Sequence, residues 1–452
     1  MTLELNNKRV LVLGLGDTGL SALRWLKGQG ARLSVADTRA KPPGLDTVKS
    51  QWPEIAIHLG TLREEVLVQA ELIVISPGVA LAEPAVQAAL AQGVPVVGDV
   101  ELFAQYKPQQ AKVIAISGSN GKSTVTTLVG DMCRAAGLDT VVAGNIGLPV
   151  LDALSQPAPD VYVLELSSFQ LETTSSLTAD AATVLNVSED HMDRYAGLHD
   201  YAAAKARIFS GSGVQVLNRE DDLSRAMARP GSPVVTFGTD KAPSADDFGL
   251  VQRAGKTWLA QGENALLEMS ALCIPGLHNA ANALAALALC RAINLDDAPL
   301  LEVLQRFKGL PHRVQWVAKK NGIAFYDDSK GTNVGATCAA LAGMPCKVVV
   351  ILGGDSKGQD FSPLRDAVSQ NARAVVLIGR DAGMIRTALA GTGVPLIDAA
   401  SLELAVQLAY QAAQAGDAVL LSPACASFDM FKNYVHRAEV FVAAVRTLEA
   451  AA

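Results

Sequence analysis

The feature that most constrains this chain is a repeated alternation between short apolar runs and longer segments of helical length. Runs rich in Val, Ile and Leu end at Gly, Ser, Asp or Asn, and Ala- and Leu-rich segments usually separate them. This order is typical of parallel sheets, because a parallel strand is buried on both faces and needs a crossover, usually helical, before the next strand. The sequence therefore predicts an α/β protein.

The apolar runs fall into three series, which predicts three domains in a chain of 452 residues. Strands are expected at 9–13, 32–36, 71–75 and 94–97 in the first series, at 112–116, 161–166, 181–187, 213–217 and 234–237 in the second, and at 323–326, 347–352, 374–378 and 418–421 in the third. We also expect a loop-rich stretch over 238–262, a helix over 279–293 and a hinge at 309–311. The predicted domains are 1–99, 100–310 and 311–452.

Composition and charge argue against several kinds of protein. The net charge is −7 and no basic stripe is visible, which argues against nucleic-acid binding. The N-terminus has no apolar signal segment, and no apolar run is long enough to span a membrane, so we expect a cytoplasmic protein. The six cysteines are far apart without a CxxC pair, which favours reduced thiols over disulfides or a zinc site.

The strongest functional signal is the segment 112–124, which reads KVIAISGSNGKST. An apolar strand leads into a glycine-rich loop, and a helix is expected to begin at Lys122. In such a loop we expect the amides and the helix N-terminus to bind phosphate, Lys122 to neutralise the outer phosphates, and the Ser123 hydroxyl to bind magnesium. The segment therefore predicts ATP or GTP binding. Ile116 stands where the strict P-loop has its first glycine, which disfavours an ordinary P-loop GTPase.

A second glycine-rich segment, GLGDTG at 14–19, directly follows the first expected strand, and Asp37 follows the next one. This is a complete dinucleotide fingerprint, with glycines for a tight turn and close phosphate approach, and an acid to hold a ribose hydroxyl. An NAD-dependent dehydrogenase is therefore an open alternative. A different ligand that carries a diphosphate satisfies the same physical requirements.

Polar groups follow two further strands of the second series. Glu165 is expected at the sheet edge beside the phosphate loop, where a second magnesium ligand belongs, since magnesium prefers oxygen ligands. His191 lies in NVSEDHMDRY after the next strand and is a candidate metal ligand or proton carrier. Lys205 lies in YAAAKARIF, where the local pattern alone predicts a solvated lysine on an amphipathic helix.

Several later motifs place polar side chains at a helix start or just past a strand. Asn279 and Asn282 are three residues apart in GLHNAANA and so share one helix face. LPHRV places Arg313 at the expected hinge, and the motifs YDDSKGT, LGGDSKGQD and LSPACASFDMFKNY each follow a strand of the third series. The carboxyl ends of parallel strands form the ligand-binding edge of an open sheet, so these motifs predict a ligand site in the third domain.

Taken in order, IAISGSNGKST, VLELSSFQLE, NVSEDHMDRY, GLHNAANALAA, LPHRV, DDSKGTN, LGGDSKGQDF and LSPACASFDMFKN resemble the Mur ligase family of peptidoglycan synthesis over essentially the whole chain. The resemblance implies a Rossmann-like N-terminal domain for a UDP-substrate, a central P-loop ATPase-type domain with a parallel-rich sheet, and a Rossmann-like C-terminal domain for an amino acid. It implies that ATP and two magnesium ions serve to join D-glutamate to UDP-N-acetylmuramoyl-L-alanine. The D configuration comes from the resemblance alone. We expect a monomer with no nucleic-acid or membrane partner.

The resemblance also implies a role for each matching position. The UDP-substrate would contact Gly14, Leu15, Gly16, Asp17, Thr18, Gly19, Asp37, Thr38, Arg39, Ser76, Pro77, Gly78 and Asn145. ATP would contact Gly118, Asn120, Gly121, Lys122, Ser123, Thr124, Asn279, Asn282, Arg313 and Asp328. The magnesium ligands would be Ser123, Glu165, His191 and Lys205, the last as a carbamate. Glutamate would be surrounded by Lys330, Thr332, Lys357, Ser427 and Tyr434.

The implied chemistry gives the motifs their tasks. Hydroxide is a poor leaving group, so ATP would convert the alanyl carboxylate into an acyl phosphate, which the glutamate amine then attacks. Lys122, His191 and Lys205 are the expected catalytic residues. Two further alternatives stay open. One is another ligase of the superfamily, such as folylpolyglutamate synthase or a ligase that adds alanine, diaminopimelate or lysine, and the other is a nonenzymatic P-loop switch.

Overall fold

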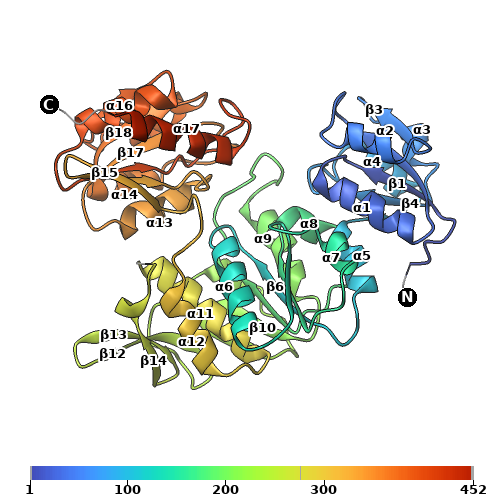
Figure 1. The fold of residues 1–452 in the computed structure, drawn as a ribbon, viewed down its shortest axis with the longest axis horizontal. Helices are drawn as coiled ribbons and strands as arrows, with labels where there is room; N and C mark the ends of the chain where they lie inside the picture. The colour runs from blue at the N-terminus through green and yellow to red at the C-terminus, as the bar shows by residue number, and fades with distance from the viewer. Residues whose placement is uncertain (1–2, 275, 449–452) are drawn as a thin grey trace. The chain divides into compact units, whose positions relative to one another are not determined.

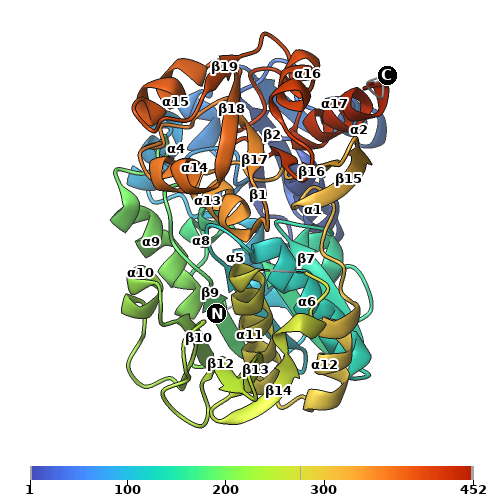
Figure 2. The ribbon, with the colours of Figure 1, turned by 90° about the vertical axis from the view of Figure 1, so that its left-hand side faces the viewer.

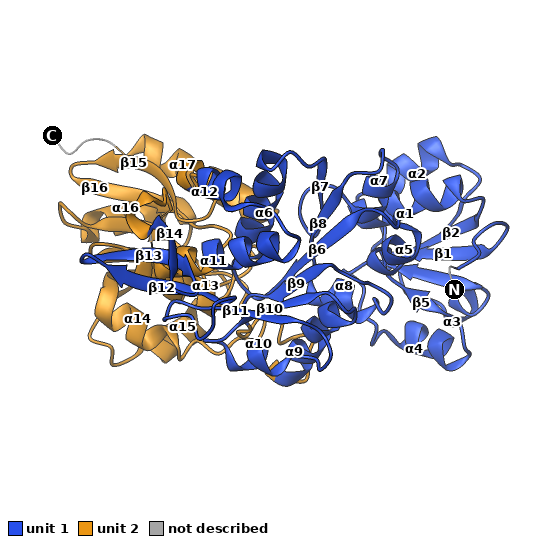
Figure 3. Ribbon diagram, turned by 90° about the horizontal axis from the view of Figure 1, so that it is seen from below, with its two compact units in different colours: residues 1–186, 199–268, 282–304 blue, residues 187–198, 269–281, 305–452 orange. Residues whose placement is uncertain are grey.

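The computed structural model describes residues 3–274 and 276–448 and contains three sheets built largely of parallel strands (Figure 1). The chain divides into two compact units (Figure 3). Unit 1 comprises 1–186, 199–268 and 282–304 and holds the first two sheets. Unit 2 comprises 187–198, 269–281 and 305–452 and holds the third sheet.

The first sheet has five parallel strands in the order β3-β2-β1-β4-β5. Its elements are β1 (Arg9–Leu13), α1 (Asp17–Gly28), β2 (Arg32–Asp37), α2 (Leu45–Gln51), β3 (Ala56–Leu59), α3 (Glu64–Leu67), β4 (Leu72–Ile75), α4 (Pro84–Ala91) and β5 (Val96–Val97). Leu11 and Leu13 of β1 share a core with Ile73 and Ile75 of β4 and with Val86 of α4. The strand order reverses between β1 and β4, and α/β sheets bind ligands at such a switch point.

The second sheet has nine strands in the order β14-β13-β12-β11-β10-β9-β6-β8-β7. Its strands are β6 (Lys112–Ser117), β7 (Thr140–Gly144), β8 (Val161–Glu165), β9 (Ala181–Val184), β10 (Val214–Asn218), β11 (Val234–Phe237), β12 (Phe248–Arg253), β13 (Lys256–Gln261) and β14 (Asn264–Glu268). Its helices are α5 (Asp99–Tyr106), α6 (Lys122–Ala135), α7 (Val150–Leu154), α8 (Ser168–Glu172), α9 (Leu198–Ala206), α10 (Asp222–Ala226), α11 (Leu277–Ala292) and α12 (Asp297–Arg306). Short 3₁₀ turns occur at Arg207–Phe209 and Met269–Ala271.

The loop-rich stretch expected over 238–262 is wrong in its second half, which forms the hairpin of β12 and β13. The strands pair antiparallel from Phe248 with Gln261 to Arg253 with Lys256. The two turn residues, Ala254 and Gly255, have φ values of 49° and 75°. Such a turn, left-handed at both positions, matches the twist of the paired strands. The turn therefore needs only two residues, and the polar composition of the stretch conceals the strands on either side.

The third sheet has six strands in the order β15-β16-β20-β17-β18-β19. Its elements are β15 (Gln315–Lys320), β16 (Ile323–Asp327), α13 (Val334–Gly343), β17 (Val348–Gly353), α14 (Leu364–Asn371), β18 (Ala372–Ile378), α15 (Ala382–Leu389), β19 (Leu396–Asp398), α16 (Leu402–Ala412), β20 (Ala418–Leu421) and α17 (Tyr434–Thr447). Val350 and Leu352 of β17 pack against α13, α14 and α15, whereas Val349 and Ile351 pack against α16 and α17. Figure 2 shows these two groups of helices on opposite sides of β17. Successive side chains of a strand point to opposite faces, so β17 is apolar throughout.

Within the described part of the chain, no helix combines the length and apolar character needed to cross a membrane. The expected helix over 279–293 is confirmed as α11, and the structure has a strand within each expected strand range. Besides β12 and β13, the strands β3, β7, β14, β15 and β19 are absent from the prediction. These five lie at an edge of their sheet.

Asp99 at the start of α5 is a buried acid with an incompletely satisfied carboxyl group. Asp99 is 3% exposed, and its Oδ1 has no hydrogen-bond partner among the described residues. Burial raises the pKa of Asp99 to about 6, although hydrogen bonds from Val100 and Gln170 act in the opposite direction. Because this value lies above the ordinary 3.8, protonation of Asp99 favours the folded state. That stabilisation is complete below the unfolded value and is lost as the pH rises through about 6.

We expect the substitution Asp99→Asn to remove this pH dependence. Between about pH 4 and pH 6, the wild type should lose up to about 3 kcal/mol of stability relative to the variant, at about 1.4 kcal/mol per pKa unit. Unfolding followed by circular dichroism at several pH values measures this difference. Asp222→Asn is the control, because the Asp222 side chain is 89% exposed. A stability difference that is the same at every pH would contradict the prediction.

Candidate active site

The glycine-rich segment 14–19 lies at the switch point of the first sheet, where β1 and β4 end. Gly14 has a φ of +95°, and a Cβ atom there would lie 2.8 Å from the Ser76 Cβ. The Ser76 hydroxyl donates a hydrogen bond to the Gly14 carbonyl at 3.1 Å. A Cβ on Gly19 would lie 2.0 Å from the same carbonyl oxygen. The two glycines are therefore needed for close packing, and the predicted loops 14–19 and 76–78 lie together.

Asp37 at the end of β2 is already engaged by neighbouring protein groups. Its Oδ2 accepts hydrogen bonds from the Leu15 amide and from Arg39 Nη2, both at 2.7 Å, and its Oδ1 accepts two more from Arg39. Burial acts to raise the pKa of Asp37, but the hydrogen bonds from Arg39 and Leu15 outweigh it, and the pKa lies below its ordinary value. Asp37 is therefore an anion that holds the glycine-rich segment 14–19 in place through the Leu15 amide. Both of its oxygens are occupied, which disfavours the ribose contact that a dehydrogenase needs.

The phosphate loop follows β6, which lies between β8 and β9 in the second sheet, and α6 begins directly after it (Figure 3). Gly121 has a φ of +83°, and a Cβ atom there would lie 2.5 Å from the Asn282 Oδ1. Lys122 Nζ donates a hydrogen bond to the Gly118 carbonyl at 2.8 Å. The N-terminus of a 14-residue helix and a lysine ammonium thus meet at one loop. This arrangement suits the phosphates of a nucleoside triphosphate.

Asn186, for which the sequence predicts no role, holds the phosphate loop in place. Its Oδ1 accepts a hydrogen bond from the Asn120 amide at 2.8 Å, and its Nδ2 donates to the Asn120 carbonyl at 3.1 Å. Its own carbonyl accepts a hydrogen bond from the Ser119 amide at 2.9 Å. Asn186 therefore fixes two consecutive residues of the loop. The one signal for this in the sequence is its position just past an apolar strand.

Glu165 at the end of β8 is 1% exposed and fits the predicted role of a magnesium ligand. Its Oε1 accepts a hydrogen bond from Asn145 Nδ2 at 2.7 Å, whereas its buried Oε2 has no partner within the described residues. A buried carboxylate oxygen without a partner is costly, and a cation would remove that cost. No group of three or more His, Cys, Asp or Glu side chains suited to a metal occurs in the described ranges. Magnesium bound to phosphates needs only one or two carboxylates.

Lys205 on α9 is buried beside the phosphate loop, so the expectation of a solvated lysine is wrong. Lys205 is 1% exposed, and its Nζ donates a hydrogen bond to the Gly118 carbonyl at 3.0 Å. The Nζ also lies 4.3 Å from the centroid of the Tyr201 ring. Local periodicity did not predict this burial, because α9 packs against segments distant in the sequence. The structure thus brings Lys205 and Lys122 to the same carbonyl.

In unit 2, three loops that follow strands of the third sheet lie side by side. These loops are 328–333 after β16, 354–359 after β17 and 422–431 after β20. The Ala424 amide donates to the Gly331 carbonyl at 3.0 Å, and the Asp355 amide donates to the Ala426 carbonyl at 3.0 Å. The residues predicted to surround glutamate lie on these loops and at the start of α17, namely Lys330, Thr332, Lys357, Ser427 and Tyr434. The structure therefore brings their segments together.

Arg437 on α17 links two of these loops and is another residue for which the sequence predicts no role. It is fully buried. Its Nη1 donates to the Cys425 carbonyl at 3.1 Å, and its Nη2 donates to the Ser329 carbonyl at 2.7 Å. Burial lowers the pKa of Arg437 to about 10. The guanidinium therefore stays charged at neutral pH and ties together the loops after β16 and β20.

Arg313 and Asp328, both predicted to contact ATP, lie on neighbouring segments of unit 2. Asp328 Oδ2 accepts a hydrogen bond from the Ser422 hydroxyl at 2.6 Å, and Oδ1 accepts one from the Val314 amide at 3.3 Å. Burial raises the pKa of Asp328 to about 7, against the opposing effects of Ser422 and Arg313. His312 and Val314 have φ values of 62° and 45°. Left-handed backbone is strained for non-glycine residues, and above all for a β-branched one, and such strain gathers at functional sites.

The segment 187–198 belongs to unit 2, and it carries His191. The carboxylate of Asp190 forms an ion pair with Lys357 and accepts a hydrogen bond from Asn333 Nδ2 at 3.4 Å. His191 Nε2 lies 3.7 Å from Asp190 Oδ2. Asp190 thus connects the candidate metal ligand His191 to the candidate glutamate residue Lys357.

The predicted residues fall into both units. Unit 1 holds every predicted contact of the UDP-substrate, the phosphate-loop residues, Glu165, Lys205 and Asn282. Unit 2 holds His191, Asn279, Arg313, Asp328 and the predicted glutamate contacts. α11 carries both Asn279 and Asn282, as expected. The individual binding roles stay predictions.

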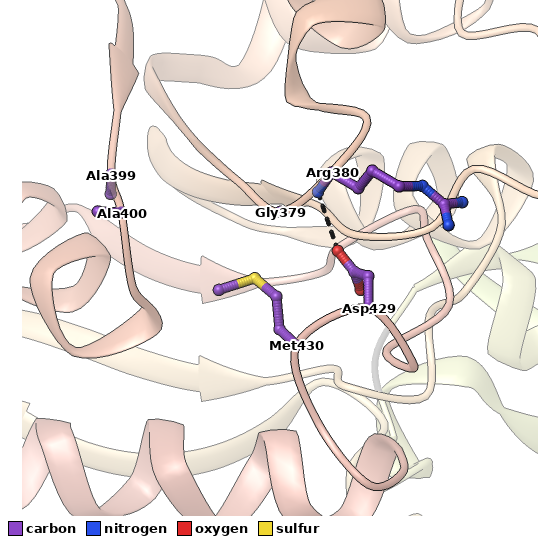
Figure 4. A pocket seen from close by; sticks show the side chains of 6 residues that line it. All are labelled: Gly379, Arg380, Ala399, Ala400, Asp429 and Met430. Atoms are coloured by element: carbon purple, nitrogen blue, oxygen red, sulfur yellow. Dashed lines mark hydrogen bonds between the residues drawn. The ribbon is translucent and has the colours of Figure 1, made fainter.

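A cavity of about 560 Å³ lies where β18 and β19 end (Figure 4). It is lined by Gly379, Arg380, Ala399, Ala400, Asp429 and Met430. The Arg380 amide donates a hydrogen bond to Asp429 Oδ2 at 2.9 Å. None of the lining residues is a predicted site residue, although Asp429 and Met430 lie within the motif LSPACASFDMFKNY.

Comparison with known families matches all three parts of the chain. The family described as "Mur ligase MurD-like, N-terminal domain" matches residues 8–98. "Mur ligase middle domain" matches 116–290, and "Mur ligase, glutamate ligase domain" matches 312–425. The three matches together span most of the sequence.

Curated relatives are similar along their whole length. A protein of Methylobacillus flagellatus named UDP-N-acetylmuramoylalanine--D-glutamate ligase is 66% identical and covers 99% of this chain and 98% of its own. A protein of the same name from Thiobacillus denitrificans is 60% identical, with the same coverage. Among solved structures, UDP-N-acetylmuramate-alanine ligase MurC from Thermotoga maritima has a TM-score of 0.61 at 20% identity, over 97% of this chain and 99% of that one. MurF from Acinetobacter baumannii has a TM-score of 0.60 at 16% identity, over 97% and 94%.

Three α/β domains, a phosphate loop beside a buried carboxylate, and polar loops at the edge of a third sheet define an ATP-dependent ligase. The solved structures show that this architecture is shared at low identity. The chain belongs to the Mur ligase family. The expected family and the expected fold of three domains are thereby confirmed.

We expect the substitution Asn186→Ala to weaken nucleotide binding, because it removes both side-chain hydrogen bonds to the phosphate loop. Loss of one or two such bonds should raise the dissociation constant for ATP by about 10-fold, since each contributes about 1 kcal/mol. Isothermal titration calorimetry measures this constant. Asn264→Ala, at an exposed position at the start of β14, is the control. Equal ATP affinity of the wild type and the Asn186 variant would show that Asn186 does not hold the phosphate loop in place.

Proposed function

We propose that this protein uses ATP to join D-glutamate to UDP-N-acetylmuramoyl-L-alanine, giving ADP and phosphate. The observation that carries the proposal is 66% identity to a D-glutamate ligase over 99% of the chain. The site geometry agrees with the proposal, because the phosphate loop, Glu165 and Lys205 lie together at one edge of the second sheet. The dehydrogenase alternative is not favoured, since the oxygens of Asp37 are already occupied by protein donors. Other ligases of the superfamily are not favoured either, because the relatives that carry those names are far less similar.

The first sheet is proposed to bind the uridine nucleotide. The segment 14–19 and the loop after β4 present backbone amides at a switch point, where a diphosphate binds. Arg39 is more than half exposed in its side chain and is held by Asp37, so it is placed to contact the uracil or ribose. Asn145, bonded to Glu165, would link the substrate arm to the metal site.

ATP is proposed to bind the phosphate loop, with magnesium ions held by Ser123, Glu165, His191 and carbamylated Lys205. Magnesium would offset the charge of the phosphates during transfer. The unpartnered Oε2 of Glu165 supports this assignment. Burial of Lys205 supports the carbamate, because a buried ammonium is costly, whereas a carbamate would supply an anion beside the phosphate loop. Lys122 would neutralise the transferring phosphoryl group.

The third sheet is proposed to bind glutamate through Lys330, Thr332, Lys357, Ser427 and Tyr434. Two lysines in this set suit a substrate with two carboxylates. The buried guanidinium of Arg437 would hold the loops after β16 and β20 next to each other through its hydrogen bonds to both. The domain bounds proposed are 1–99, 100–310 and 311–452. We further propose a cytoplasmic monomer that acts in peptidoglycan precursor synthesis, and hence in cell shape and division.

The proposed reaction can be tested by measuring phosphate release. We expect release only when ATP, magnesium, UDP-N-acetylmuramoyl-L-alanine and D-glutamate are all present, and little with L-glutamate, L-alanine, diaminopimelate or lysine. Lys122→Ala should lower kcat by about 100-fold or more, the size seen when one charge-stabilising donor is removed. Lys27→Ala, on the exposed face of α1, is the control. Absence of both ADP and a new amide in the complete mixture would refute the proposal.

The carbamate on Lys205 can be detected directly. Enzyme exchanged in ¹³C-bicarbonate should show a carbamate carbon resonance in NMR spectra, and the Lys205→Ala variant should lack it. Activity of the variant should be low in buffer and should recover partly with added short-chain carboxylic acids, because these supply the missing anion. An active wild-type enzyme without the resonance would remove the assignment.

A further inference from the structure

His312 is a residue of the third domain to which the proposed function gives no role. Its Nδ1 lies 2.7 Å from Oδ2 of Asp327, whose side chain is 1% exposed. The other oxygen of Asp327 accepts hydrogen bonds from the amide and the hydroxyl of Ser329, at 2.9 Å and 2.5 Å. A carboxylate can only accept, so Nδ1 of His312 carries a proton. The imidazole ring is therefore held in one orientation, and Nε2 is left for another partner.

The His312 ring lies beside two residues predicted to surround glutamate. It meets the Tyr434 ring edge to face, with ring centroids 6.0 Å apart and an interplanar angle of 74°. Lys330 Nζ lies 5.5 Å from the centroid of Tyr434, and the Lys330 amide donates to the His312 carbonyl at 3.2 Å. The His312 side chain is 24% exposed, so a ligand can reach it. An imidazole and an ammonium thus gather around one aromatic ring.

The charge balance of this region favours a further cationic contact for the substrate. Glutamate carries two carboxylates, and Lys357 already forms an ion pair with Asp190. The titratable and charged groups near the pair of His312 and Asp327 are Arg313, Asp328, Lys330, Tyr434 and Arg437. An imidazolium there would be compensated by the carboxylate behind it while its Nε2 proton points to a ligand.

Resting on the proposed function, we propose that His312 is a specificity-determining residue whose protonated imidazole donates a hydrogen bond from Nε2 to a carboxylate of the incoming glutamate. Asp327 is the positioning residue that orients the ring and balances its charge. No bond is made or broken at His312 and its proton is not transferred. The contact would favour a dicarboxylic amino acid over its amides.

The role of His312 has a signature in the pH dependence of the KM for glutamate. The hydrogen bond from Nε2 exists only while the imidazole is protonated, so this KM should rise as the pH increases. The KM for ATP should not follow the same change. A histidine that instead removes a proton from the glutamate amine would lower kcat at acid pH, which is the opposite dependence.

The test compares His312→Gln and His312→Asn with wild-type enzyme and with His58→Gln, the same change at a partly exposed position of β3 in the first domain. Gln keeps a neutral donor at every pH, and Asn tolerates the positive φ of this position. We expect both His312 variants to raise the KM for D-glutamate by about 10- to 100-fold, the range for a hydrogen bond to a charged group. Their KM should no longer rise with pH, and the KM for ATP should stay unchanged.

Substrate analogues give a second readout. Against D-glutamine and D-isoglutamine, each lacking one carboxylate, the His312 variants should lose most of the preference for D-glutamate over one of the two amides, which identifies the carboxylate contacted. A His312→Gln enzyme with the KM and pH dependence of the wild type would overturn the inference, as would a change confined to kcat at acid pH.

If neither variant folds, the wild type alone decides the matter. A KM for D-glutamate that stays constant from acid to alkaline pH would overturn the inference. A wild type that releases no phosphate on the full substrate set would instead refute the proposed function itself. The two failures are therefore distinguishable.

Discussion

The placement of the candidate functional groups depends on one constraint, which is that parallel strands end at the same edge of their sheet. The glycine loop follows β1, the phosphate loop follows β6, and Glu165 ends β8 directly beside β6. In the third sheet the loops after β16, β17 and β20 meet through backbone hydrogen bonds. Segments distant in sequence thus meet because their strands are neighbours, and loop conformation only refines the result.

Buried charges with protein partners hold these edges rigid. Asp37 fixes the glycine loop, Lys205 bonds the phosphate loop, and Arg437 joins two loops of the third sheet. Backbone groups bond to each of these charges, and breaking one of these contacts would leave a buried group unpaired, which costs more than the contact itself contributes. Such a network favours one arrangement of the loops before any substrate binds, and preorganised groups are what acyl transfer requires.

Most of the strands that the sequence did not predict share a position in the fold. β3, β7, β14, β15 and β19 are all edge strands, and their residues are less buried than those of β1, β6 or β17. An edge strand pairs on one side only and keeps polar residues, so it lacks the continuous apolar run by which central strands are predicted. The strands β12 and β13 lie inside the second sheet and were missed for a different reason, because their turn is only two residues long and the stretch around it is polar.

The sequence by itself determined the three-domain α/β architecture, the phosphate loop, the glycine fingerprint and the family, because these depend on local runs and on motifs with fixed spacing. Only the tertiary structure decided that Lys205 is buried, that Asn186 braces the phosphate loop and that Arg437 joins two loops. It also decided the pairing of His312 with Asp327. Each of these facts is a contact between segments far apart in the chain or a consequence of packing against them. Local periodicity carries no information about which distant segment will cover a given side chain.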